Sequence, residues 1–105
     1  MRVEISEAIT IGEGGEITFA QLIEYSGLPE HELRELVTYG ALAPRDPAAP
    51  SWSFDASALR AARLAERLRH DFELDANALS VILRYVERIE ALEAELRALR
   101  AGVAR

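Results

Sequence analysis

The fold is decided by one stretch, TFAQLIEYSGLPEHELRELVTYGA, which occupies residues 18–41. Thr18 and Gln21 have the residue types and spacing of a capping box, in which a hydroxyl and an amide bond the free N–H groups at a helix start. Gly27 ends this first helix, and Pro29 suits the first turn of a second one because its missing N–H would have no intrahelical partner there. Two short helices around a tight turn predict a helix-turn-helix.

The residues that follow predict a small wing. Gly40 is the left-handed residue expected after the second helix. Two short strands are expected over Ala41–Arg45 and Ser51–Phe54, with Phe54 facing the core. The DPAAP segment between them would form an exposed loop, because its prolines interrupt strand pairing.

Two further helices are predicted after the wing. Asp55 can cap a third helix that runs to about Phe72, and the ELD sequence of residues 73–75 then makes a corner. From Asp75, a second plausible cap, no Pro or Gly occurs before Gly102. One long helix is therefore expected, about 40 Å in length at ~1.5 Å per residue.

The long helix carries two apolar faces. Leu79, Leu83 and Val86 are placed to pack on the small domain. The second face steps by three and four residues, as a heptad seam does, and consists of Ile82, Tyr85, Ile89, Leu92, Leu96, Leu99 and Val103. Because nothing that follows residue 90 could cover this seam, we expect it to be the interface of a homodimer. The alternatives are a seam buried within the chain and a single helix stabilised by Glu–Arg pairs, and the flanking charges fit parallel and antiparallel dimers.

Composition and charge exclude some classes of functional site and favour one class of partner. The 105 residues suit one compact domain, and without Cys the chain has no disulfide, thiolate nucleophile or Cys-based metal site. Residues 1–40 contain eight Glu and two Arg, a net charge of −6, whereas residues 41–105 contain ten acidic residues and ten Arg. DNA affinity rests mainly on Lys and Arg that neutralise phosphates, so the acidic part favours a basic protein partner.

The N-terminal residues predict an arm. Apolar and polar residues alternate from Val3 to Ile11, as in short strands or an ordered arm, and the interspersed Glu residues argue against a signal peptide. No stretch is apolar enough for a membrane span. We expect a cytoplasmic protein with three parts: an arm over 1–16, a helix-turn-helix domain over 17–74 and a helix over 75–105.

Other candidates for chemistry are weak. His31 and His70 lack the spacing of metal ligands, and His70, near Asp71 and Glu73, is expected to be a surface helix residue. The GEGG sequence of residues 12–15 lacks the Lys and the Ser or Thr of a phosphate-binding loop and is expected to be a turn. Glu93 and Glu95 belong to a solvated helix with no pocket. We therefore expect no catalytic residue, no metal, no cofactor and no enzymatic activity.

Four segments carry a resemblance to known families: Gly27–Leu28, Gly40–Arg45, Trp52–Asp55 and Arg67–His70. Their order is similar to that in MerR-type regulators, which are DNA-binding dimers with an antiparallel coiled coil. The chain more closely resembles the CbpM family of chaperone modulators, with an N-terminal arm longer than we expect of that family. The resemblance implies a mainly α fold: a MerR-like winged helix-turn-helix with a small β wing and a long C-terminal dimerisation helix.

The resemblance also implies a function. Members of the CbpM family bind the J-domain of a DnaJ-like co-chaperone, CbpA, and inhibit its stimulation of the Hsp70 chaperone DnaK. The surface of a J-domain that faces Hsp70 is basic, so we expect it to meet the surface carboxylates of the helix-turn-helix: Glu24, Glu30, Glu32 and Glu35. The alternative is a MerR-type DNA-binding transcriptional regulator, for which Arg34 and Arg45 supply few phosphate contacts.

Overall fold

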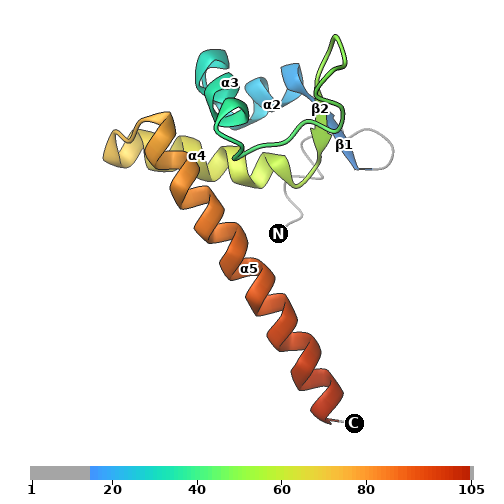
Figure 1. Cartoon of the computed structure of the whole chain (residues 1–105). Coiled ribbons are helices and arrows are strands. Elements are labelled where there is room, and N and C mark those ends of the chain that lie inside the picture. Colours follow the sequence, from blue (N-terminus) through green and yellow to red (C-terminus); the bar gives the residue numbers. More distant parts are fainter. Residues whose placement is uncertain (1–14, 105) are drawn as a thin grey trace.

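The computed structural model describes residues 15–104 of the chain. The elements, in chain order, are β1 (Glu16–Thr18), α2 (Phe19–Ser26), α3 (Glu30–Thr38), β2 (Ser53–Asp55), α4 (Ala58–Phe72) and α5 (Ala76–Ala104). Figure 1 shows α2 and α3 on one side of α4, the small sheet near one end of α4, and α5 leaving this body as a long rod. The mainly α fold with a small sheet and a long C-terminal helix is confirmed. The expected strands or arm over Val3–Ile11, and most of the GEGG turn, lie outside the described residues.

Local hydrogen bonds fix the helix-turn-helix. The Thr18 Oγ1 accepts from the Gln21 N–H at 3.1 Å, and the Gln21 Oε1 accepts from the Thr18 N–H at 3.0 Å, so the capping box is confirmed. Gly27 ends α2 with a φ of 83°, a left-handed conformation that glycine adopts at little cost. Inside the turn, the buried Ser26 Oγ accepts from the Leu28 N–H at 3.1 Å, which satisfies a donor that water cannot reach.

The second helix ends as the sequence predicts. Gly40 has a φ of 83°, and its N–H donates to the Val37 carbonyl at 3.0 Å. The Ala41 N–H donates to the Leu36 carbonyl at 2.9 Å, so two carbonyls of the last turn of α3 have partners. This closure directs the chain away from α3 toward the extended segment that precedes β2.

The sheet forms between different segments from those predicted. β2 pairs antiparallel with β1, in the register Glu16↔Asp55, Ile17↔Phe54 and Thr18↔Ser53. The expected strand over Ala41–Arg45 is not a strand, and its backbone link to β2 is the Arg45 N–H to Ser53 carbonyl bond at 2.8 Å. β2 pairs with β1 because this places Ile17 beside Phe54 in the core. Residues 41–45 are a poorer partner, since Pro44 has no N–H to donate to a neighbouring strand.

Asp75 caps the last helix as expected, but the N-cap of α4 is Ser57 and not the predicted Asp55, because α4 begins at Ala58. The Asp55 Oδ2 accepts from the Ser57 N–H at 3.3 Å and the Ser57 hydroxyl at 2.7 Å, just ahead of α4. The Asp75 Oδ1 accepts from the Ala78 N–H at 2.9 Å, which caps α5 as expected. Between the helices, Glu73 turns the chain with a left-handed φ of 56°.

The core lies where α2, α3, the sheet, α4 and the beginning of α5 meet. Its buried apolar residues include Ile17, Leu22, Leu28, Leu33, Leu36, Phe54, Leu59 and Leu79. Leu79 and Leu83 anchor α5 in this core and Val86 is half-buried, as expected for the inner face of that helix. From residue 87 to residue 102 every α5 residue is exposed. Among the described residues, no helix has the length and apolar character needed to cross a membrane.

Candidate protein-interaction surfaces

Three of the four predicted partner-binding carboxylates lie on the surface of the helix-turn-helix. Glu24 is exposed on α2, and Glu30 and Glu35 are exposed on α3. Glu30 is ion-paired with Arg34, while the Glu24 and Glu35 carboxylates have no partner among residues 15–104. These three carboxylates therefore come from two neighbouring helices of the helix-turn-helix.

Glu32 differs from the other three. Its side chain is only 18% exposed, and its Oε1 is buried without a hydrogen-bond partner in the described part of the chain. Its Oε2 lies 3.7 Å from the His31 Nε2. Glu32 precedes Leu36 by four residues, which places it beside the buried row of α3, where α5 packs. The prediction that all four carboxylates are surface groups is therefore wrong for Glu32.

Arg34 is held against the protein by three groups. Its Nη2 and Nε donate to the Glu30 Oε2 at 2.8 and 3.0 Å. Its guanidinium carbon lies 5.0 Å from the centroid of the Phe19 ring and 5.5 Å from that of Trp52, within the range of cation–π interactions. This guanidinium therefore links α3 to the start of α2 and to the segment before β2.

The aromatic rings under Arg34 form a connected cluster. Phe19 and Trp52 meet edge to face with centroids 5.4 Å apart, and Trp52 meets Phe54 at 6.3 Å. Phe54 is buried in the core as predicted, while Trp52 is half-buried and donates its Nε1–H to the Pro47 carbonyl at 3.3 Å. The loop before β2 is thus fastened to the helix-turn-helix through Trp52.

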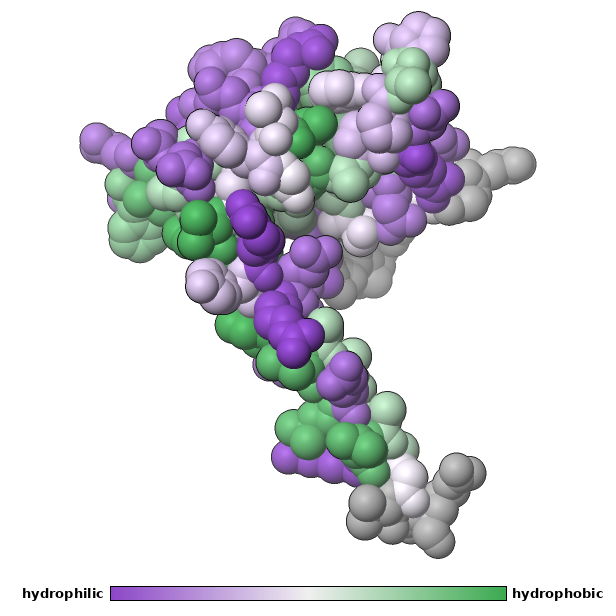
Figure 2. Space-filling view, in the orientation of Figure 1, coloured by the Kyte–Doolittle hydropathy of each residue, from purple (hydrophilic) through white to green (hydrophobic). Residues whose placement is uncertain are grey.

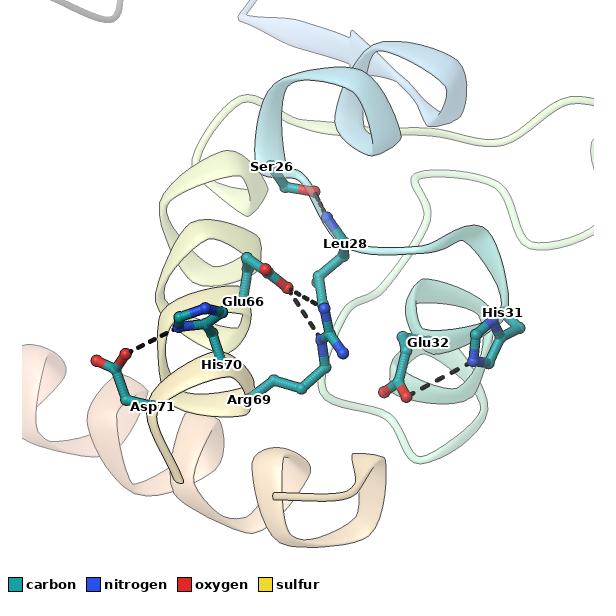
Figure 3. A network of polar contacts seen from close by, with 8 residues as sticks. All are labelled: Ser26, Leu28, His31, Glu32, Glu66, Arg69, His70 and Asp71. Atoms are coloured by element: carbon teal, nitrogen blue, oxygen red, sulfur yellow. Dashed lines mark hydrogen bonds and ion pairs between the residues drawn. The ribbon is translucent and has the colours of Figure 1, made fainter. Parts of the chain in front are cut away.

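The two histidines lie on different helices and face their own neighbours. Figure 3 shows His31 directed to Glu32 on α3, and His70 directed to Asp71 on α4. The His70 Nδ1 lies 3.2 Å from the Asp71 Oδ1, and the His70 side chain is 79% exposed, as predicted; that of His31 is 74% exposed. Among residues 15–104, no group of three or more potential ligands could hold a metal ion.

The carboxyl group of Asp55 has a pKa that its neighbours shift. Hydrogen bonds from the Ser57 hydroxyl and the Ser57 N–H, and then from the Arg45 guanidinium, lower the pKa of Asp55 below its ordinary value of 3.8. The carboxyl is exposed, and its partners are local. These local hydrogen bonds account for the shift.

The second candidate surface is the apolar stripe of α5. Figure 2 shows hydrophobic side chains along the part of α5 that projects beyond the body. The exposed members are Val81, Tyr85, Ile89, Leu92, Leu96 and Leu99, with exposed fractions from 44% to 68%. Ile82 is half-buried, and the Val103 side chain lies outside the described part. From Tyr85 to Leu99, the predicted seam is therefore uncovered in a single chain.

Sequence reasoning missed two parts of these surfaces. Val81 extends the stripe and lines a shallow depression with Tyr85, Arg84 and Arg88. Helical spacing could have predicted this, because Val81 lies four residues before Tyr85 on the same face of the helix. The contacts of Arg34 with the Phe19 and Trp52 rings could not be predicted from local spacing, since the two rings come from other segments of the chain.

Comparison with known proteins assigns the family. Residues 17–101 match the family model described as MerR HTH family regulatory protein. The chain is 34% identical over 88 residues to the chaperone modulatory protein CbpM of Escherichia coli O139:H28, an alignment that covers 84% of this chain and 87% of that relative. The chaperone modulatory protein CbpM of Shigella boydii serotype 18 matches with the same identity and coverage. The chain belongs to the CbpM family, within the MerR-type helix-turn-helix proteins.

Proposed function

We propose that this protein is a cytoplasmic chaperone modulator that binds the J-domain of a DnaJ-like co-chaperone and inhibits its stimulation of the Hsp70 chaperone DnaK. The relatives that carry the name chaperone modulatory protein CbpM support the general role. The J-domain is the partner that the family resemblance implies. The protein acts by occupying a surface of its partner, so its chemistry is recognition and not catalysis.

The observation that carries the proposal is the charge of the helix-turn-helix surface. Glu24 and Glu35 are exposed carboxylates without partners in the described chain, and Glu30 adds a third. A basic J-domain surface would be attracted to this face from a distance. Such attraction raises the association rate and the specificity more than the affinity, and it weakens as salt screens it over a Debye length of about 8 Å at 0.15 M.

The DNA-binding alternative has little support from this surface. A helix that reads the major groove needs basic or amide side chains directed at bases and phosphates. Arg34 is the only arginine of α3, and its guanidinium is engaged by Glu30, Phe19 and Trp52. To bind a phosphate, Arg34 would have to leave these partners while the neighbouring carboxylates repelled the DNA.

We also propose that the protein acts as a homodimer joined through the α5 stripe. Five large apolar side chains after residue 84, including Leu92 and Leu96, are between 44% and 68% exposed in the single chain. A contiguous exposed apolar stripe of this kind is usually an interaction surface. Its heptad spacing suits a second copy of the same helix.

The test of the proposed function is inhibition of a chaperone reaction. ATP hydrolysis by DnaK is measured with a cognate J-domain protein, with and without this protein. The expected result is a dose-dependent loss of the J-stimulated rate, with the basal rate of DnaK unchanged. If this protein is in excess over the J-domain protein and the J-stimulated rate is unchanged, the proposal is contradicted.

The site is tested separately by charge reversal. The variant Glu24→Lys, Glu30→Lys, Glu35→Lys should slow association with an immobilised J-domain, while its far-ultraviolet circular dichroism stays unchanged because all three residues are exposed. The matched control changes the same charge elsewhere on the surface, with Asp71→Lys, Glu73→Lys and Glu87→Lys. Equal association rates for the two variants would show that the J-domain docks on another face.

A further inference from the structure

A groove lies between α4 and α5, on the face of α5 away from the apolar stripe. Its volume is about 800 Å³, and its apolar floor includes Ala61, Leu64, Leu83 and Val86. Leu83 lies on the opposite side of α5 from Tyr85 and its stripe, given 3.6 residues per turn. A second copy seated on the stripe would therefore leave this groove open.

The α4 wall of the groove carries a surplus of positive charge. Arg60, Arg63 and Arg67 line this wall at helical spacing, and Glu87 and Glu90 line the α5 wall. Arg60 is paired with Glu90 across the groove at 2.5 Å, and Arg63 donates its Nε–H to the Tyr25 carbonyl at 3.1 Å. Arg67 is exposed and has no partner among residues 15–104. The groove thus offers an apolar floor with arginines along one side.

The chain enters the described part of the structure at the mouth of this groove. The Gly15 carbonyl accepts from the Ala56 N–H at 2.5 Å and lies 3.5 Å from the Arg45 Nη2. Asp55 and Ser57, the neighbours of Ala56, both line the groove. Gly15, at which the described part of the chain begins, is therefore fixed beside the groove.

The sequence of the residues that precede Gly15 complements the groove. In an extended conformation, Ile5, Glu7, Ile9 and Ile11 would fall on one side of the chain and Glu4 on the other, because successive side chains alternate. Ile9 lies six residues before Gly15, so it can reach about 20 Å at ~3.3 Å per residue. The groove runs beside α4 from Ser57 to Arg67, about 15 Å at ~1.5 Å per residue. The reach and the apolar pattern of this segment therefore suit the groove, and Glu7 supplies a negative charge on the side that carries the isoleucines.

We propose that residues 4–11 of the same chain bind in the α4–α5 groove, with the isoleucines on its floor and Glu7, on the same side of the chain, toward Arg63 and Arg67. This intrachain docking site fastens α4 to the base of α5 and shields apolar floor residues such as Leu64. It also sets how firmly the projecting helix is held relative to the helix-turn-helix. The proposal does not depend on the identity of the partner chaperone.

The absence of Cys from the chain allows a direct test by disulfide formation. Ala61→Cys in the groove floor is combined in turn with Glu7→Cys, Ile9→Cys and Ile11→Cys in the full-length protein. The control replaces Ala61→Cys by Ala20→Cys, an exposed position on α2 only five residues from Gly15. If the N-terminal segment did not bind the groove, disulfides to residue 20 would form faster than those to residue 61, because shorter loops close more readily.

The expected result is an intrachain disulfide to residue 61 at one or more arm positions, formed faster than any disulfide to residue 20. Faster oxidation with residue 20 at all three arm positions would overturn the proposal. A disulfide between two chains, seen as a doubled mass without reductant, would place the arm in the partner's groove and overturn the intrachain assignment. Either outcome is independent of J-domain binding, so it can be separated from failure of the proposed function.

A second measurement avoids the strict geometry of disulfides. The variant Ile9→Asp, Ile11→Asp should shift the backbone amide resonances of Ala61 and Leu64, because buried carboxylates would expel the arm from the groove. Thr10→Asp, on the other side of the extended chain, should shift them much less. Identical resonance shifts for the two variants would contradict the proposal. A shift of the Ala61 amide resonance that arises only when a J-domain is added would also contradict it.

Discussion

The α5 stripe gives the sharpest prediction about assembly. Leu92 and Leu96 are 44% and 46% exposed in the single chain. Full burial of a leucine side chain is worth roughly 1.5–3 kcal/mol, so covering the exposed half of each is worth roughly 0.7–1.4 kcal/mol. The four leucines of a dimer then contribute roughly 3–6 kcal/mol, which corresponds to a factor of roughly 10²–10⁴ in the dissociation constant.

The variant Leu92→Glu, Leu96→Glu should therefore be monomeric, since it loses this burial and places four carboxylates in an apolar seam. Multi-angle light scattering at micromolar concentration should give twice the chain mass of 11.6 kDa for the natural sequence and 11.6 kDa for the variant. The matched control, Ala94→Glu with Ala101→Glu, adds two carboxylates on the opposite face of α5 and should remain dimeric. A natural protein of 11.6 kDa, or a dimeric Leu92→Glu, Leu96→Glu variant, would refute the reasoning.

Three other predictions concern the small domain. Thr18→Ala should lower the free energy of unfolding by about 1 kcal/mol, measured by thermal circular dichroism, because the Gln21 N–H loses its cap, whereas Thr18→Ser should retain it. Asp55 should titrate below pH 3.8 by NMR, and Ser57→Ala should raise its pKa by removing the main hydrogen-bond donor. Because folding lowers this pKa, the stabilisation is present above pH 3.8 and is lost as the pH falls through the folded-state value; an unmoved midpoint would contradict the assignment. Duplex DNA should give no complex in a fluorescence anisotropy titration at physiological salt, since Arg34 is engaged and its neighbours are acidic, and a tight salt-sensitive complex would restore the regulator interpretation.

The features that the sequence predicts well are those with local causes. The capping box at Thr18, the left-handed Gly27 and Gly40 and the cap at Asp75 each depend on residues a few positions apart. Heptad spacing likewise identifies the exposed stripe, because periodicity on one helix needs no knowledge of its neighbours. These signals were enough to place the helix boundaries within a few residues.

The features that could not be predicted depend on contacts between distant segments. The pairing of β1 with β2 joins Ile17 to Phe54, and a strand closer to β2 in sequence was the simpler expectation. Glu32 is largely covered by the fold, and no pattern within α3, which packs against α5, specifies this. The groove between α4 and α5 exists only because the two helices cross, so its arginine wall has no signature beyond helical spacing.

The central claim is that a J-domain binds the acidic face of the helix-turn-helix, and a single NMR titration tests it most directly. Unlabelled cognate J-domain is added to the isotope-labelled protein, and the shifts of its backbone amides are mapped on the structure. Saturable shifts that centre on α2 and α3 around Glu24, Glu30 and Glu35, and that diminish with added salt, are the predicted result. A spectrum that stays unchanged with excess J-domain, or shifts confined to surfaces outside α2 and α3, would contradict the account.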